Sequence, residues 1–353
     1  MSSLIVPVTL QLPTGIEGMT PAFFSSALST WHPATTVTEV RIGQVIPGTA
    51  TKLAVELEYG TDTTLPSRMW VKAGWEKHSA AVTAQYRAEV TFYSCIADSL
   101  DINTPQCYFA GIDPVSGSGL LLLEDLTLRP VTFGDATRPI TVDQVAQVLG
   151  LQANYHARHW NSEILWAPWL KGSHNESTFH ETMVSEEHWS RHLAMPRGEL
   201  LPPPLRDRHR VAAALAHIFE ITSTPPEPCL IHADPHLGNL FFETDGRPGL
   251  LDWQSPQRGH WAHDVTYTLI STLSVEDRRA HQGDLLHGYL RDRAALGVAV
   301  PHFDQAWHAY RQHVIYGFMW SMCPPEIQAE ENVVAMTERF ATAGIDLDTL
   351  SVV

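Results

Sequence analysis

The sequence predicts an α+β protein of two lobes: a small N-terminal lobe with an antiparallel sheet and one helix, and a larger helical C-terminal lobe. The chain has 353 residues, which is enough for two packed units. Before residue 125, short segments rich in β-branched and aromatic residues are separated by Gly, Pro and Thr turns, as strands are. After residue 125, apolar residues recur mostly at helical spacing. We therefore expect the lobes to comprise residues 1–125 and 126–353.

The N-terminal lobe contains four strand-like segments and one helical segment. The strand-like segments read "EVRIGQVI", "TKLAVELEY", "SRMWVKAGW" and "GLLLLEDL". The helical segment is "SAAVTAQYRAEVTFYSCIADSL", in which Val82, Tyr86, Val90 and Tyr93 recur at helical spacing. Together they predict a small sheet with one helix.

The C-terminal lobe is expected to be mostly helical. Its periodic segments are roughly 141–160, 176–194, 206–223, 262–273, 276–294, 302–322 and 326–343. The clear β element in this half is "LFFETDGRPGLLDW", because Asp245-Gly246 is the strongest two-residue signal for a hairpin turn. No other segment of this half gives a clear β signal.

Composition narrows the classes of function. Lys plus Arg number 23 against 39 Asp plus Glu, which gives a net charge of −16. This balance argues against a nucleic-acid or anionic-membrane surface, both of which need a basic footprint. No apolar run approaches the ~20 residues that span a bilayer, and no basic residue precedes Arg41, so a signal peptide is not expected. The four scattered cysteines fit a reducing compartment, and we expect a cytoplasmic protein.

The predicted hairpin gathers polar side chains. If Asp245 and Gly246 form the turn, Asn239 falls directly opposite Asp252 in a non-hydrogen-bonded pair, with Cα atoms roughly 4.5 Å apart. Asp234 lies five residues before Asn239, in a loop that can fold back over the same face. The hairpin therefore predicts two carboxylates and an amide oxygen close together.

Three interpretations of these side chains are open. Asn239 and Asp252 alone would more often form only a polar rim on the hairpin. With Asp234 added, the oxygen atoms suit a hard cation, above all Mg²⁺ bound together with a substrate phosphate. A zinc site at His232, Asp234 and His236 is the third interpretation, but it leaves Asn239 and Asp252 without a role.

The segments "HADPHLGNLFF" and "LLDWQ" carry a resemblance to a known family. An H-x-D-x₄-N motif followed thirteen residues later by an Asp resembles the catalytic core of protein-kinase-like phosphotransferases. The segments are most similar to the aminoglycoside phosphotransferase and choline kinase branch, and Gln254 after Asp-Trp is similar to ecdysteroid-kinase-like members. The resemblance implies the two-lobed protein-kinase-like fold.

An ATP-binding lobe should then lie upstream, and the residues fit one. In "MWVKAG", Lys72 resembles the nucleotide-binding strand lysine of that fold. Glu89, on the edge of the apolar stripe of the predicted helix, resembles its glutamate partner, because a carboxylate that points inward needs an opposite charge. Taken alone, Glu89 would be a solvated helix residue.

The resemblance also implies a phosphate-covering loop and a linker. Gly43 and Gly48 lie between two strands where that loop belongs, although G-x-G-x-x-G is absent. Thr49 and Thr51 are either phosphate donors or turn residues. Backbone groups from Glu124 to Leu126 would hold the edge of adenine.

The implied reaction is transfer of the γ-phosphoryl group of ATP, or alternatively GTP, to a hydroxyl group. Lys72 would hold the α and β phosphates, while Asn239 and Asp252 would bind Mg²⁺. Asp234 would accept or orient the proton of the acceptor hydroxyl. Asp264 resembles the Asp that braces the catalytic loop from beneath.

The expected partner is a small-molecule hydroxyl acceptor, and the protein is expected to be a monomer or a homodimer. The tryptophans of the helical lobe are either core packing or an apolar wall around a bulky alcohol. The residues expected to contact the substrate are His236, Trp160, Trp166, Trp169 and Trp320. An aminoglycoside or other antibiotic, held by Glu181, Glu186 and Glu187, is the alternative acceptor. A catalytically inactive binding module on the same fold is the alternative of another class.

Overall fold

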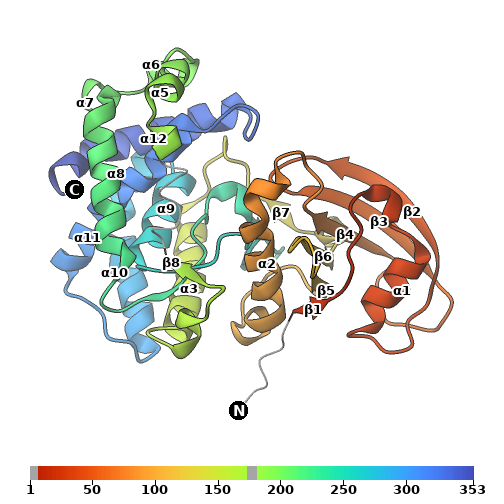
Figure 1. Ribbon diagram of the computed structural model, residues 1–353. Coiled ribbons are helices and arrows are strands. Elements are labelled where there is room, and N and C mark those ends of the chain that lie inside the picture. The colour runs from red at the N-terminus through yellow and green to blue at the C-terminus, as the bar shows by residue number, and fades with distance from the viewer. Residues whose placement is uncertain (1–6, 173–180) are drawn as a thin grey trace. The chain divides into compact units, whose positions relative to one another are not determined.

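The computed structural model describes residues 7–172 and 181–353. Its contacts divide the chain into two compact units. Unit 1 contains the chain up to Val131 together with Leu251–Ser255, and unit 2 contains Thr132–Leu250 together with Pro256–Val353. Unit 1 contains a large sheet and unit 2 is mostly helical, as Figure 1 shows, so the predicted α+β fold class is confirmed.

The core of unit 1 is a sheet in the order β1-β5-β6-β4-β3-β2. Neighbouring strands are antiparallel except β1 and β5, which are parallel. The strands predicted from the sequence are all present in it. The strands are β1 (Val8–Thr9), β2 (Val37–Ile46), β3 (Thr51–Tyr59), β4 (Arg68–Ala73), β5 (Cys107–Ile112) and β6 (Gly119–Glu124).

Unit 1 has a helix that the sequence analysis missed. Helix α1 spans Pro21–Ser29, and its N-cap Thr20 accepts a hydrogen bond from the backbone N–H of Phe23. The expectation of one helix is therefore wrong in this detail. Helix α1 is short, and its start is marked only by the Thr20-Pro21 pair, which is a common helix beginning. The predicted helix is present as α2 (Thr83–Cys95).

The alternation of side chains in β4 separates two environments. Val71 belongs to the apolar cluster that also contains Phe24 and Leu28 of α1. Lys72, the next residue, points to the other face because successive side chains of a strand alternate. That face is the one that meets α2, since Lys72 contacts Glu89 of α2. The strand thus places the ammonium group of Lys72 against α2.

Unit 2 is built from the helices expected after residue 140. The main helices are α3 (Val142–Arg158), α5 (Glu186–Leu193), α8 (Arg208–Ser223), α9 (Ala262–Thr272), α10 (Val275–Ala295), α11 (Phe303–Gly317) and α12 (Glu330–Asp346). Short helices follow α5 at α6 (Pro196–Glu199) and α7 (Pro203–Arg206), and the 3-10 helix η8 (Phe318–Met322) follows α11. Part of the segment predicted at 176–194 lies outside the described residues. Every residue of α9 is buried, so this helix forms the centre of the unit.

Unit 2 also contains more β structure than expected. Strands β10 (Leu240–Phe242) and β11 (Pro248–Leu250) form the predicted hairpin, and β7 (Thr132–Phe133) joins them. A second sheet has the order β8-β12-β9, with β8 (Lys171–Gly172), β12 (Gln257–Gly259) and β9 (Cys229–Ile231). The expectation of a single β element in this half is therefore wrong, because strands of two or three residues are too short to show alternation.

The register of the hairpin differs from the predicted one by one residue. Leu240 pairs with Leu250, and the N–H of Glu243 donates to the carbonyl of Arg247. The loop thus contains three residues and ends in Gly246 at φ +86°, an arrangement common in three-residue hairpins. Asn239 and Asp252 both lie outside the ladder, and the predicted pairing of these two residues is wrong.

Among residues 7–172 and 181–353, no helix combines the length and apolar character needed to cross a membrane.

Candidate active site

Lys72 lies between two carboxylates in unit 1. Its Nζ is 2.7 Å from Oε1 of Glu89 and 2.6 Å from Oδ1 of Asp252. Lys72 and Glu89 are 6% and 2% exposed. Burial lowers the pKa of Lys72, but the charges of Asp252 and Glu89 outweigh it, so the pKa is raised and the ammonium is charged. The predicted contact between Lys72 and Glu89 is confirmed.

Burial has the opposite effect on Glu89. Desolvation raises the pKa of its carboxyl group, and the neighbouring ammonium of Lys72 opposes that change. Without Lys72, the buried carboxylate would lose its ion-pair partner. The opposite charges of Lys72 and Glu89 therefore compensate each other in the interior of unit 1.

Asp252 is held by the backbone and by its neighbour in sequence. Its φ of +60° is in the left-handed region, which Asp tolerates better than most residues. The ring of Trp253, which is fully buried, stacks on Phe92 of α2 at a centroid distance of 4.1 Å and an interplanar angle of 7°. Lys52 lies 3.8 Å from the second carboxylate oxygen of Asp252. The carboxylate thus has lysines on both sides.

The loop between β2 and β3 is anchored to α2. Tyr86 donates its hydroxyl to the carbonyl of Thr49 at 2.5 Å. The hydroxyl of Thr51, the first residue of β3, donates to Glu76 at 2.7 Å, which supports a structural role for Thr51. Gly48 is exposed, and a Cβ there would meet only the carbonyl of Ala50 at 3.5 Å. The fold itself therefore does not require a glycine at this position.

The linker after β6 contains a residue that the sequence analysis missed. Asp125 is buried, and it accepts hydrogen bonds from Trp70 Nε1 at 3.1 Å and from the N–H of Thr127 at 3.0 Å. The N–H of Glu124 already donates to another backbone carbonyl. Contacts to adenine from this segment would therefore have to use other backbone groups of Glu124 to Leu126.

In unit 2, Asn239 is tied to Asp234. Its Nδ2 donates to the backbone carbonyl of Asp234 at 2.9 Å and to its Oδ2 at 3.3 Å. Because the amide nitrogen is engaged with Asp234, the amide oxygen of Asn239 faces away from that carboxylate. This orientation suits an oxygen ligand for a hard cation. The Asp234 side chain is 31% exposed.

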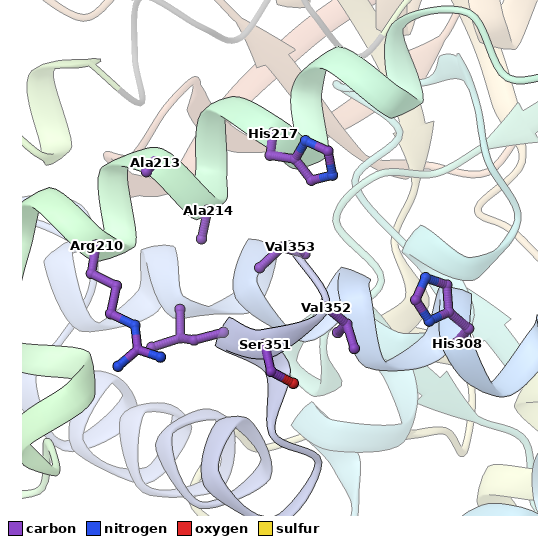
Figure 2. A pocket seen from close by; sticks show the side chains of 9 residues that line it. Arg210, Ala213, Ala214, His217, His308, Ser351, Val352 and Val353 are labelled. Atoms are coloured by element: carbon purple, nitrogen blue, oxygen red, sulfur yellow. The ribbon is translucent and has the colours of Figure 1, made fainter.

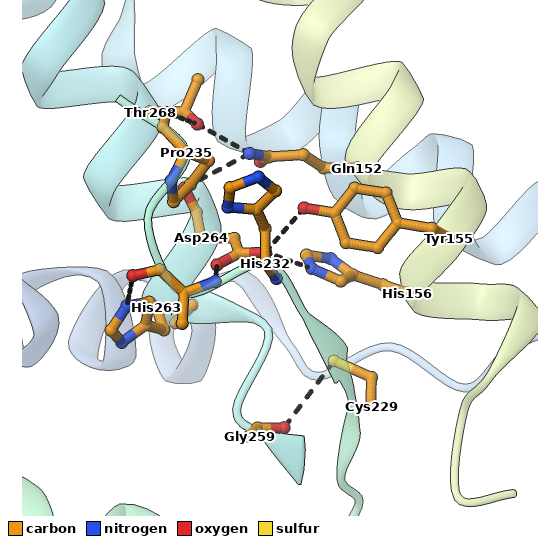
Figure 3. A network of polar contacts seen from close by, with 12 residues as sticks. Gln152, Tyr155, His156, Cys229, His232, Pro235, Gly259, His263, Asp264 and Thr268 are labelled. Atoms are coloured by element: carbon orange, nitrogen blue, oxygen red, sulfur yellow. Dashed lines mark hydrogen bonds and ion pairs between the residues drawn. The ribbon is translucent and has the colours of Figure 1, made fainter. Parts of the chain in front are cut away.

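Asp264 braces the loop that carries Asp234, as predicted. Figure 3 shows its carboxylate at the centre of a buried network, where it accepts the N–H groups of His232 at 2.7 Å and Ala233 at 3.0 Å. Tyr155 donates its hydroxyl to the same carboxylate at 2.6 Å. Burial raises the pKa of Asp264, but the hydrogen bond and charge of His156 outweigh it, so the pKa is well below its ordinary value. Asp264 therefore supports the backbone of this loop.

The zinc interpretation finds no support. His232 Nδ1 accepts the N–H of Asp234 at 3.2 Å, and His236 Nδ1 accepts the N–H of Gly238 at 3.0 Å. The Nδ1 atom of each ring is therefore engaged with the backbone of its own loop. Within the described part of the chain, no cluster of three or more His, Cys, Asp or Glu side chains is suited to hold a metal ion.

The predicted tryptophans differ in their surroundings. Trp320 is 6% exposed, and its ring meets that of His236 edge to face at 5.0 Å. Trp160 is stacked by the guanidinium of Arg293 at 3.9 Å and packs on the core, while Trp166 is 60% exposed beneath Arg258. Trp169 is half-buried. Trp320 is the member of this group that the structure places beside the Asp234 loop.

The acidic residues named for an aminoglycoside are all exposed. Glu186 and Glu187 occupy the first turn of α5, where carboxylates favour the positive end of the helix dipole, and both are exposed. Glu181 is exposed as well.

A cavity of about 690 Å³ lies elsewhere in unit 2, shown in Figure 2. Arg210 and His217 of α8, His308 of α11 and Val352 line it, and none of the predicted site residues does.

More than half of the sequence matches one protein family. The model of the "Phosphotransferase enzyme family" (APH) matches residues 76–299, which is more than half of the chain. The chain belongs to this family. The matched range contains Glu89, Asp234, Asn239, Asp252 and Asp264, and it begins just after Lys72. The resemblance predicted from the sequence is confirmed, and the more specific likeness to ecdysteroid-kinase-like members stays a prediction.

Solved structures of other proteins share the fold of this chain. Choline kinase LicA from Streptococcus pneumoniae is 12% identical at a TM-score of 0.51, over 93% of this chain and 98% of that chain. APH(2")-IIia, in a complex with GDP and kanamycin, is 11% identical at a TM-score of 0.51, over 92% and 99%. LicA in complex with AMP gives 12% identity and a TM-score of 0.51, over 94% and 98%. At these identities the likeness shows the kinase-like fold alone. No curated protein sequence matches the phosphotransferase described here.

Proposed function

We propose that this phosphotransferase transfers the γ-phosphoryl group of ATP to the hydroxyl group of a bulky, apolar alcohol, with Mg²⁺ as the metal. Structural neighbours solved with AMP and with GDP support a purine nucleotide as the donor. Phosphoryl transfer depends mainly on positioning and on neutralising charge. The residues described above offer groups for both tasks.

Lys72 is assigned to the α and β phosphates, with Glu89 holding it in place. A fixed ammonium supported by a buried carboxylate is well suited to bind phosphate oxygens. Gly48 in the loop between β2 and β3 is assigned to the close approach of the phosphates, and Glu124 to Leu126 to adenine. GTP in place of ATP is an alternative that nucleotide competition would distinguish.

Asn239 and Asp252 are assigned to Mg²⁺, and their chemistry fits. Asn239 keeps its amide oxygen turned away from Asp234, and a carboxylate such as that of Asp252 has more lone pairs than Lys72 occupies. Mg²⁺ typically binds one or two protein carboxylates together with substrate phosphates. The bound metal would neutralise the charge of the transferred group.

Asp234 is assigned to the acceptor hydroxyl. Its side chain is partly exposed, and Asn239 and His236 both lie on its Oδ2 side. A carboxylate in this position can orient the hydroxyl or accept its proton. Asp264 holds the loop backbone in the folded protein. Positioning Asp234 for the reaction therefore costs no further conformational entropy of the loop.

The apolar acceptor rests on one observation, the aromatic surroundings of Asp234. His236 and Trp320 meet edge to face, and Tyr267 of α9 joins Trp320 by a hydrogen bond of 2.5 Å. A polycation would need several free carboxylates, but Glu326 and Glu330 near this region pair with Arg191 and Arg197. Aromatic rings favour the burial of apolar surface.

A panel of hydroxyl compounds with ATP or GTP and Mg²⁺ would test this proposal. The readout is release of nucleoside diphosphate, followed by mass spectrometry of the acceptor. We expect turnover with bulky apolar alcohols such as steroids. Turnover confined to kanamycin-like polycations would favour the antibiotic alternative, and nucleotide binding without any turnover would favour an inactive module.

A further inference from the structure

Two lysines of the sheet in unit 1 lie directly opposite each other. In the antiparallel register of the neighbouring strands β3 and β4 (Figure 1), Lys52 pairs with Lys72. Opposite residues of such a pair project from the same face of the sheet, with Cβ atoms about 4.5–5.5 Å apart. Leu53 and Val71, the next pair along the ladder, belong to the apolar cluster on the other face. Both lysines therefore extend from the face opposite this cluster.

The carboxylate of Asp252 contacts both lysines, one with each oxygen. Its Oδ1 is 2.6 Å from Nζ of Lys72, and its Oδ2 is 3.8 Å from Nζ of Lys52. The two lysines differ in exposure, since the Lys72 side chain is 6% exposed and that of Lys52 is 46% exposed. A negatively charged ligand that reaches Lys72 from solvent therefore comes close to Lys52 as well.

The stability of the fold does not account for a lysine at position 52. Like charges directly opposite each other destabilise a sheet. Among the described residues, Lys52 forms one ion pair, with Asp252, and ion pairs of exposed side chains contribute little to stability. Lys72, by contrast, also pairs with the buried carboxylate of Glu89 at 2.7 Å. Binding of an anion would give Lys52 a role that the fold does not.

Lys52 is able to exchange its carboxylate partner for a phosphate. Its distance of 3.8 Å from Asp252 exceeds a hydrogen bond, so no short contact holds the ammonium there. A lysine ammonium is a compact charge on a flexible stem, and it can turn from one anion to another. Contacts between an ammonium and phosphate oxygens are charge-assisted and therefore strong.

We propose that Lys52 is a second phosphate-binding lysine, which leaves Asp252 and binds the phosphates that follow the α phosphate of the nucleotide. The inference rests on the proposed function, because it adds a residue to the nucleotide site assigned to Lys72. Lys72 is assigned to the α and β phosphates, so the more exposed lysine beside it is left for the β and γ phosphates. Lys52 would thus favour nucleoside diphosphates and triphosphates over monophosphates.

Titration calorimetry of Lys52→Met with AMP, ADP and a nonhydrolysable ATP analogue tests this role. We expect the affinity for ADP and for the analogue to fall roughly tenfold, because a charge-assisted contact is lost. The affinity for AMP should change less than about twofold, since AMP has no phosphate beyond the α phosphate. Lys52→Arg should keep most of the affinity for ADP, because a guanidinium also binds phosphate. Unchanged affinity for ADP in Lys52→Met, or an equal loss for AMP, would overturn the role.

Arg41→Met is the matched control. Arg41 lies on β2 of the same sheet, and its side chain is 51% exposed and pairs with Glu39 and Glu58. The variant removes one positive charge, as Lys52→Met does, but from a position that is not opposite Lys72. We expect the affinities for AMP, ADP and the analogue to stay within about twofold of the wild type. A loss for ADP equal to that in Lys52→Met would overturn the role, because it would show an effect of net charge alone.

Competition between Asp252 and phosphate gives a second test. In titrations without Mg²⁺, Asp252→Asn should raise the affinity for ADP, because a carboxylate no longer competes for the ammonium groups. In the Lys52→Met background the same change should raise the affinity less, since one of the two ammonium groups is absent. Equal increases in both backgrounds would overturn the exchange of partners by Lys52.

The titrations need no acceptor, so they separate this inference from the proposed function. Loss of ADP affinity in Lys52→Met, in a protein that transfers phosphate to no acceptor, would support the role of Lys52 and remove the proposed function. Wild-type ADP affinity in Lys52→Met, in a protein that phosphorylates an apolar alcohol, would overturn the role of Lys52 and leave the proposed function in place. A wild-type protein that binds neither ADP nor the analogue would overturn both.

Discussion

The ammonium of Lys72 lies 2.7 Å from the carboxylate of Glu89, and both side chains are buried in unit 1. The two residues are on different elements, β4 and α2, so the ion pair joins the sheet to the helix. It also places an ammonium beside Asp252, at 2.6 Å. A single lysine therefore compensates two carboxylates.

Removing that lysine should cost stability as well as activity. In Lys72→Met, the buried carboxylate of Glu89 would lose its ion-pair partner, so we expect a loss of about 3–5 kcal/mol in urea unfolding at pH 7. Lys52→Met is the matched control, because Lys52 is 46% exposed and 3.8 Å from Asp252. The loss of unfolding free energy in Lys52→Met should stay below about 1 kcal/mol. Similar losses in both variants would contradict the buried role of Lys72.

Asp264 should stabilise the protein in a pH-dependent way. Asp264→Asn replaces one acceptor oxygen by a donor opposite the N–H groups of His232 and Ala233, so we expect a loss of about 2–4 kcal/mol at pH 7. The folded-state pKa of Asp264 is depressed, so its contribution is present above the unfolded pKa of ~3.9 and is lost as pH falls below it. The difference between wild type and variant should therefore be smaller at pH 3 than at pH 7.

Asp113→Asn is the control for this prediction. Asp113, in unit 1, accepts the N–H groups of Ser116 and Leu12, which lower its pKa to about 2. It should show the same pH trend in unfolding, but kcat of the folded protein should not change. We expect kcat to fall in Asp264→Asn, whose side chain supports the Asp234 loop. An equal fall of kcat in Asp113→Asn would show that the effect of Asp264 on kcat is not specific to the loop.

Sequence patterns predicted the contacts that local geometry determines. The face of β4 that carries Lys72 follows from strand alternation, and the inward face of Glu89 follows from helical spacing. Asp264 was predicted from its motif, and its contacts with the loop agree with that prediction. The roles of these residues in catalysis stay predictions.

Contacts set by packing were harder to predict. Asp245 and Gly246 are compatible with a two-residue turn and with a three-residue loop that ends at Gly246. The sequence favoured the two-residue turn, but the structure has the three-residue loop, which shifts the register by one residue. Asp264 reaches the backbone N–H groups of His232 and Ala233 because α9 packs against the loop.

Gly48 should matter for the nucleotide and not for the fold. A Cβ at this position meets only one backbone oxygen at ordinary contact distance, so Gly48→Ala should change the free energy of unfolding by less than about 0.5 kcal/mol. Nucleotide affinity, measured by calorimetric titration, should fall because the phosphates could no longer approach the backbone closely. Gly134→Ala is a contrast, since its Cβ would lie 1.9 Å from a carbonyl oxygen of Leu237, and it should destabilise the protein. Unchanged affinity in Gly48→Ala would remove Gly48 from the site.

Substitution by glycine should destabilise the protein less at Ala233 than at an alanine within a helix. Its φ of +69° is strained for a residue with a Cβ, by about 1–2 kcal/mol. Glycine removes that strain at an entropic cost of about 0.5–1 kcal/mol, so Ala233→Gly should be neutral or stabilising by up to about 1 kcal/mol. Ala153→Gly, in the buried middle of α3, should lose about 1 kcal/mol or more. Thermal unfolding of both variants checks the contrast, and a larger loss for Ala233→Gly would refute it.

Asp234→Asn and Asp252→Asn should both abolish transfer, for separable reasons. Asp252 is assigned to Mg²⁺ and contacts Lys72, so Asp252→Asn should weaken the Mg²⁺-dependent part of nucleotide affinity, because a ligand charge is lost. Asp234 is assigned to the acceptor hydroxyl, so Asp234→Asn should bind the nucleotide with Mg²⁺ nearly as the wild type does. Calorimetric titration of a nonhydrolysable ATP analogue, with and without Mg²⁺, measures both effects. Equal loss of Mg²⁺-dependent affinity in the two variants would contradict this division, because it would place both carboxylates on the metal.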